Sequence, residues 1–158
     1  MKFSDILIAV ASLAVIFLFL AVILGYFMTP AMGWDWGPAV SSFGSVLISG
    51  LIVGAIFSKK IWEEAGIKTI AKIIVLGAVL SMLYYAAAIP SQGDWTPYVK
   101  ETFQNTHPGT TLTTSEWFSV EVAALGQEIA INVFFLIVLG FTGLYVGSML
   151  RKSRNSQE

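Results

Sequence analysis

The sequence predicts an all-α membrane protein, a bundle of four transmembrane helices with both termini on the cytoplasmic side. Two observations lead to this fold class. First, 56% of the 158 residues are hydrophobic and only 12% are charged, whereas a soluble domain carries about 25% charged residues. Second, the hydrophobic residues fall into four blocks, each close to the ~20 residues that a helix needs to cross a hydrocarbon core of roughly 30 Å.

Charged or helix-breaking residues bound each block. The first block is longer than the roughly 7–15 apolar residues of a signal-peptide core, and Asp5 precedes it, so we interpret it as a retained span. Pro38 opens the second block, where a first-turn proline is tolerated, and the third block stops before Pro90. The single predicted domain is 1–150, with spans at 6–28, 38–58, 68–89 and 128–150 and a cytoplasmic tail at 151–158.

Short connections are predicted between the first three spans. Residues 29–37 contain Pro30, Gly33 and Gly37. Because proline and glycine interrupt regular structure, we expect a tight loop there. Two lysines then close the second span, and residues 59–67 are predicted to form a short charged connection to the third span.

A polar segment, residues 90–113, is predicted to form a small outer loop subdomain. Thr96 followed by Pro97 is typical of a helix start, with threonine as the cap and proline at the first helical position. Val99 and Phe103 are four residues apart. They would give this short helix an apolar side, because residues at that spacing share one face.

The last helix is predicted to be much longer than a membrane span. Thr113 and Glu116 fit a capping box, so the helix should begin near Thr114. It should then run without a break to Leu150. Residues 114–127 are therefore predicted to stand outside the membrane as a protruding extension of the fourth span.

Charge placement predicts the orientation. Basic residues concentrate on the inner side of bilayers when loops are short, and only Lys100 would lie outside if the N-terminus is inside. The other eight basic residues are Lys2, Lys59, Lys60, Lys68, Lys72, Arg151, Lys152 and Arg154. Tryptophan favours the membrane–water boundary, and the predicted interface anchors are Trp34, Trp36, Trp95 and Trp117 outside and Trp62 inside.

Small residues predict how the helices pack. Lipid gives no hydrophobic drive for association, so helix interfaces in membranes favour glycine, alanine and serine. The second span carries two small-residue faces, which favours contact with helices on both sides. Packing within one bundle is the simpler interpretation, and dimerisation is the alternative. The predicted packing residues are Ser41, Ser45, Ser49, Gly50, Gly54, Gly77, Ser81, Gly143 and Gly147.

A polar stripe on the last helix is the main candidate site. Glu121, Glu128 and Asn132 lie within about 20° of one another on a helical wheel. Glu128 is roughly 33 Å from Leu150 at about 1.5 Å per residue, which places it at the outer boundary of the bilayer. One interpretation is a proton- or cation-binding site at an outer vestibule. The alternative is a hydrogen-bonded or solvated helix face.

The residue inventory limits the chemistry. The chain has no cysteine and one histidine, which excludes disulfides, thiolate metal sites and bis-histidine haem ligation within this chain. No glycine-rich phosphate loop and no extended basic surface is present, so we predict neither a cofactor nor a nucleic-acid partner. His107 is expected to be an exposed loop residue, with metal binding beside Asp94, Glu101 or Glu116 as the alternative.

Three functional hypotheses remain for a multi-pass protein of the cell membrane. Small size, the lack of redox ligands and several packing faces favour a non-catalytic accessory or structural subunit of a larger respiratory or oxidoreductase-type membrane complex. The alternative is a small oligomeric transporter or ion-conducting protein that uses Glu128 and Asn132. A membrane enzyme with acidic chemistry outside is the third. Expected partners are the lipid bilayer and other membrane subunits or a second copy.

Overall fold

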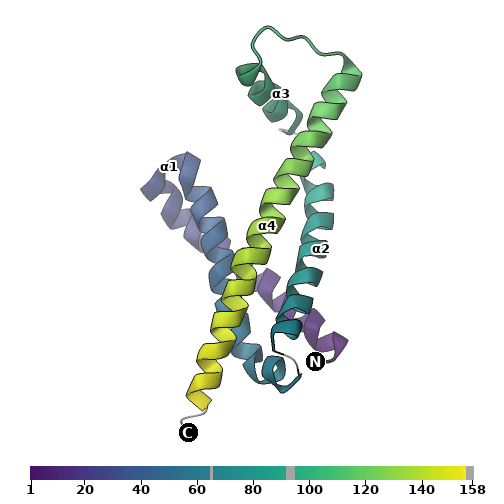
Figure 1. Ribbon diagram of the computed structural model, residues 1–158. Coiled ribbons are helices and arrows are strands. Elements are labelled where there is room, and N and C mark those ends of the chain that lie inside the picture. Colours follow the sequence, from purple (N-terminus) through teal and green to yellow (C-terminus); the bar gives the residue numbers. More distant parts are fainter. Residues whose placement is uncertain (65, 92–94, 156–158) are drawn as a thin grey trace. The chain divides into compact units, whose positions relative to one another are not determined.

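The structure, a computed structural model, describes residues 1–64, 66–91 and 95–155, with side chains except at 34–36, 38, 64, 88–91, 95, 154 and 155. Within these residues the regular structure is entirely helical, which confirms the predicted all-α class (Figure 1). The elements are α1 (Phe3–Glu64), α2 (Ile67–Ser91), α3 (Trp95–Thr106) and α4 (Thr114–Asn155).

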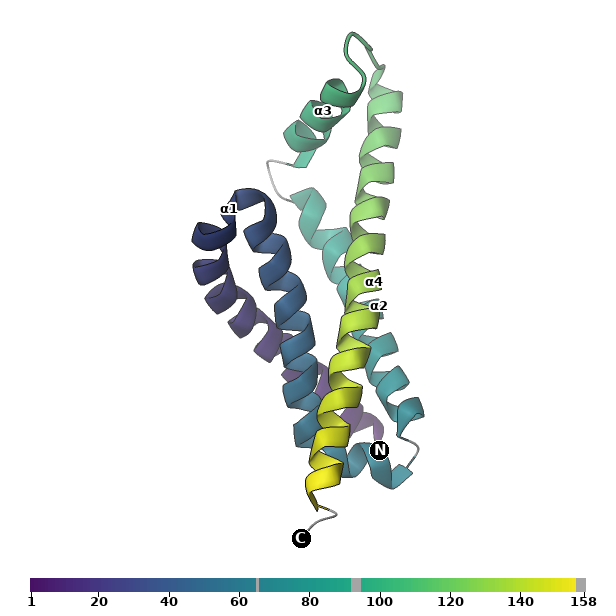
Figure 2. The same ribbon diagram turned by 60° about the vertical axis from the view of Figure 1, so that its left-hand side comes forward.

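Element α1 is a hairpin of two helical arms. The chain reverses at Gly33, whose φ of 80° and ψ of 169° are not helical. A positive φ strains residues that carry a Cβ, and glycine adopts it freely. We call Phe3–Gly33 the first arm and Ala39–Glu63 the second arm. Figures 1 and 2 show the two arms side by side.

The predicted loop at residues 29–37 is wrong in extent. Helix continues on both sides of Gly33, and Pro30 lies inside it. Beyond the turn the arms touch closely, since a Cβ added to Gly37 would lie 2.5 Å from the Thr29 Cα atom. The chain thus reverses at one glycine with a positive φ, whereas the sequence pattern predicted a loop of nine residues.

Four helices are long and apolar enough to cross a membrane: the two arms, Ile67–Ala87 in α2 and Thr114–Ser153 in α4. Their most apolar stretches have mean hydropathies between 1.9 and 3.2. Only 17% to 39% of each stretch is buried inside the protein. Most of their side chains therefore face outward, as expected of helices whose solvent is lipid. The predicted number of apolar spans is confirmed.

The helix that contains the second predicted span continues past residue 58 to Glu64, so most of the predicted connection is helical. The turn into α2 is made at Gly66, which has a φ of 47°. Its N–H donates to the Ile61 carbonyl at 2.9 Å, and its own carbonyl accepts from Thr69 and Ile70. Gly66 therefore satisfies backbone groups at the end of one helix and at the start of the next.

The chain packs as two units, which we describe separately. The first unit, Met1–Ala78 with Phe135–Glu158, holds the hydrophobic core. The second unit, Val79–Phe134, is much more open: among its described side chains Val99 alone is buried. The largest fully buried hydrophobic side chains of the first unit are Val53, Ile61, Ile70, Ile73 and Leu144.

Candidate functional site

The polar stripe predicted on the last helix lies on α4 within the second unit. Glu121, Glu128 and Asn132 are all partly buried. The Asn132 side-chain amide donates to the backbone carbonyl of Glu128 at 2.8 Å, one turn earlier on the same helix. The asparagine amide therefore bonds its own helix, and no hydrogen bond joins it to the Glu128 carboxylate in the described structure.

Glu128 faces tyrosine on α2. Its carboxylate is close enough to the Tyr85 phenol for the two to interact electrostatically. The ring of Tyr84 meets that of Tyr85 edge-on, with centroids 5.6 Å apart. No ion pair of Glu128 is present within the described residues. The arrangement is a partly buried carboxylate on α4 that interacts with a phenol on α2.

The acids of the second unit do not gather into a metal site. Among the described residues no three histidine, aspartate or glutamate side chains come together. Glu116 is instead used as a helix cap: its carboxylate accepts from the Thr113 N–H at 2.8 Å and from the Thr113 hydroxyl at 2.7 Å. This confirms that α4 begins at Thr114, with the glutamate half of the predicted capping box formed. Asp94, a predicted alternative ligand, lies outside the described residues.

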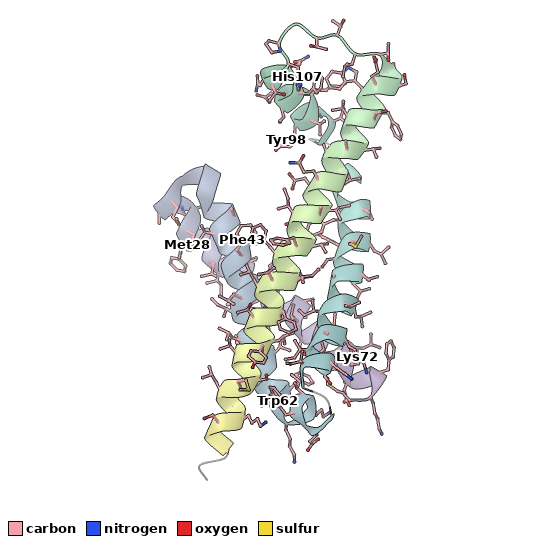
Figure 3. The ribbon with its side chains drawn as sticks, viewed as in Figure 1. Met28, Phe43, Trp62, Lys72, Tyr98 and His107 are labelled. Carbon is pink, nitrogen blue, oxygen red and sulfur yellow. The ribbon has the colours of Figure 1, made fainter. Side chains whose placement is uncertain are left out.

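Helix α3 packs against the start of α4 through aromatic rings. Phe103 stacks on His107 with centroids 4.6 Å apart and meets Trp117 edge-on at 5.3 Å. The Lys100 ammonium lies 5.6 Å from the Trp117 ring centre. His107 also contacts the Thr106 hydroxyl at 2.9 Å, and Figure 3 shows it with Tyr98 in this part of the chain. The predicted short helix is present, but it begins at Trp95, so Thr96 lies inside the helix and is not its cap.

Glycines of the second arm and of α4 form a close backbone contact, which we call the glycine seam. It comprises Gly50 and Gly54 on the second arm and Gly140, Gly143 and Gly147 on α4. A Cβ added to Gly143 would lie 2.5 Å from the Leu47 carbonyl oxygen and 3.0 Å from the Gly50 Cα atom. Cβ atoms on Gly54 and Gly147 would collide with the backbones of Leu144 and Leu51, respectively.

The predicted serines lie on the other side of the second arm, toward the first arm. Ser41, Ser45 and Ser49 are buried. Ser45 donates to the Ser41 carbonyl at 2.6 Å and Ser49 to that of Val46 at 2.9 Å, so these hydroxyls are satisfied within their own helix. A Cβ on Gly25 would lie 3.7 Å from the Ser41 hydroxyl oxygen. The second arm thus contacts a helix on each side.

The two remaining packing residues, both on α2, lie elsewhere. Among the described atoms, a Cβ added to Gly77 would meet nothing within 4 Å. Gly77 borders a small cavity between the first arm, α2 and α4 that includes Leu13 and Leu136. Ser81 is partly buried in the second unit. Gly77 therefore makes no close backbone contact of the kind that the glycine seam makes.

Sequence reasoning missed a hydrogen bond between helices. The Ser58 hydroxyl donates to the Ser148 carbonyl at 2.7 Å, and both serines are buried. Ser148 in turn donates to the Tyr145 carbonyl at 2.9 Å. The available signal was Ser58 one turn after Gly54 and Ser148 directly after Gly147, because hydroxyls commonly bond across helices in membranes.

Trp62, at the end of the second arm (Figure 3), packs against α4. Its ring lies 6.3 Å from that of Tyr145, and the Lys152 ammonium is 4.5 Å from the Trp62 ring centre. Its indole N–H is buried and has no hydrogen-bond partner in the structure. Of the other predicted anchors, Trp117 contacts Phe103, and the side chains of Trp34, Trp36 and Trp95 lie outside the described residues.

Comparisons with protein-family models, curated proteins and solved structures found no match to this chain.

Proposed function

We propose that the protein spans the cell membrane with both termini in the cytoplasm. Charge distribution supports this orientation. All basic residues except Lys100 belong to the first unit. At one end of that unit the Lys60 ammonium pairs with Asp5 at 2.6 Å. This pair joins the start of the first arm to the end of the second arm. We call this end of the first unit the basic end. A concentration of basic residues of this kind belongs on the inner side of the bilayer.

We further propose that the protein is a non-catalytic accessory subunit of a larger membrane complex. One observation carries this proposal: the early part of α4 exposes apolar side chains. Phe118 is 69% exposed and Val122 is 52% exposed. Gly126, one turn further, has no described atom within 4 Å of an added Cβ. These residues lie on one face of the helix at intervals of four.

The position of these residues relative to the membrane decides whether their apolar face meets lipid or water. If the fourth span begins near Glu128, Phe118 stands about 15 Å beyond it at about 1.5 Å per residue. Lipid tails do not reach that height, so the apolar face would meet water. Exposed apolar faces in water mark sites of protein interaction. Gly126 would let the backbone of a partner helix approach closely.

Purification from native membranes in mild detergent, followed by mass spectrometry of the copurifying proteins, tests the proposal. We expect a defined membrane subunit to copurify with the wild-type chain. The substitution Gly126→Leu should reduce its recovery about tenfold, because a branched side chain would block the close approach. Ala14→Leu, at an exposed position of the first arm, is the matched control and should leave recovery unchanged.

Two outcomes would count against the accessory role. A wild-type chain that runs alone as a monomer from native membranes would exclude it. Equal recovery of the partner with Gly126→Leu and Ala14→Leu would show that this face of α4 is not the interface.

The second candidate is a small transporter or channel, favoured by the partly buried Glu128 carboxylate beside Tyr85. In sealed vesicles, Glu128→Gln should abolish a proton- or cation-dependent flux, because the amide cannot carry the charge. Glu121→Gln is the control on the same face. A flux that is unchanged by Glu128→Gln would remove this residue from any transport path.

A further inference from the structure

A groove lies between the second arm and α4, just after the last glycine of the glycine seam on each helix. The helices touch backbone to backbone at Gly54 and Gly147, and the Ser58–Ser148 hydrogen bond continues the contact on one side. Beside it lies a groove of about 370 Å³ that is lined by Ala55, Ile56, Lys59 and Arg151. The lining therefore combines two apolar side chains of the second arm with two positive charges, one from each helix.

The two cations stand where both helices leave the apolar region. Lys59 is the first charged residue of the second arm, and Arg151 is the first charged residue of α4 after Glu128. Ala55 and Ile56 come one turn earlier on the second arm. A molecule in this groove would thus meet apolar side chains at its hydrocarbon end and positive charges at headgroup level.

Neighbouring cations already have partners within the protein. Lys60 pairs with Asp5 at 2.6 Å, and Lys152 lies over the ring of Trp62. Lys59 has only Glu63, at 3.9 Å between exposed side chains, and a pair of this kind contributes little. Arg151 makes no ion pair or hydrogen bond within the described part of the chain. The groove therefore holds two cations from two helices that are available for an external anion.

We propose that this groove binds one anionic phospholipid, with its phosphate between Lys59 and Arg151 and the start of an acyl chain against Ala55 and Ile56. A guanidinium presents paired donors that match two phosphate oxygens, and the ammonium adds a second charge. The apolar wall favours a lipid over free phosphate, which has nothing to place there. The proposal rests on the proposed membrane insertion with this end in the cytoplasm, and it does not depend on the accessory role.

Native mass spectrometry of the full chain in detergent, titrated with phosphatidylglycerol, tests the site. Juxtamembrane cations contribute about 1 kcal/mol each toward anionic lipid. The double substitution Lys59→Gln with Arg151→Gln should therefore weaken binding on the order of tenfold to thirtyfold. Lys68→Gln with Lys72→Gln removes the same charge elsewhere at the basic end and should leave the affinity near the wild-type value.

Further measurements separate the alternatives. Phosphatidylcholine with the same acyl chains should bind weakly and equally to all variants, and excess inorganic phosphate should not displace phosphatidylglycerol. Equal losses in the two double variants would overturn the site, as would displacement by inorganic phosphate. If the groove variant does not fold, the single substitutions at Lys59 and Arg151 carry the test, each with an expected loss of about fivefold.

Discussion

Two glycines of α4, Gly147 and Gly126, differ in the space that is available for a side chain. At Gly147 an added Cβ would collide with the backbone of Leu51, which cannot rotate away. At Gly126 nothing described lies within 4 Å. Both glycines cost helix propensity relative to other residues, by about 1 kcal/mol relative to alanine. Only at Gly147 is this cost offset by a helix contact that a larger residue would prevent.

This difference predicts opposite effects of one substitution on stability. Gly147→Leu should lower the free energy of unfolding by about 3 kcal/mol, at the upper end of overpacking costs, because backbone faces backbone. Gly126→Leu should leave it unchanged or raise it by several tenths of a kcal/mol. Thermal unfolding of the purified chain in detergent, followed by circular dichroism, measures both. A Gly147→Leu variant as stable as the wild type would refute the close contact.

At the scale of the element, helix cores were predictable and helix ends were less so. The start of α4 was predicted well because the capping box is local: Thr113 and Glu116 satisfy each other within one turn. The helices continue past the predicted span ends at residues 28 and 58, since Pro30 is tolerated within the first arm and the lysines at 59 and 60 do not stop the helix. Helices there end where backbone geometry requires glycine, at Gly33 and Gly66.

For the whole molecule, hydropathy predicted four spans because it sums over about 20 residues, so single misplaced boundaries do not matter. The shared face of Glu121, Glu128 and Asn132 followed from helical spacing alone. The Asn132 bond to its own helix did not, because a side-chain rotamer depends on neighbours that only the fold supplies. The exposure of Phe118 and Val122 likewise required the packed structure.

Membrane orientation is the property of the whole chain that charge alone predicts. Four spans return the chain to its starting side, and eight of nine basic residues lie on the segments assigned to the cytoplasm. The chain has no cysteine, so a single introduced thiol is a clean reporter. In sealed right-side-out vesicles, Thr110→Cys should react with a membrane-impermeant maleimide. Ser153→Cys should react only after detergent is added.

Each cysteine variant serves as the control for the other, and the cysteine-free wild type gives the background level of labelling. Both positions are exposed within the described structure, so a lack of labelling reflects the membrane and not burial. Labelling of Ser153→Cys in sealed vesicles would reverse the assigned orientation or show an odd number of spans. The lipid site depends on the same result, because the groove between Lys59 and Arg151 meets the anionic inner leaflet only if this end of the protein faces the cytoplasm.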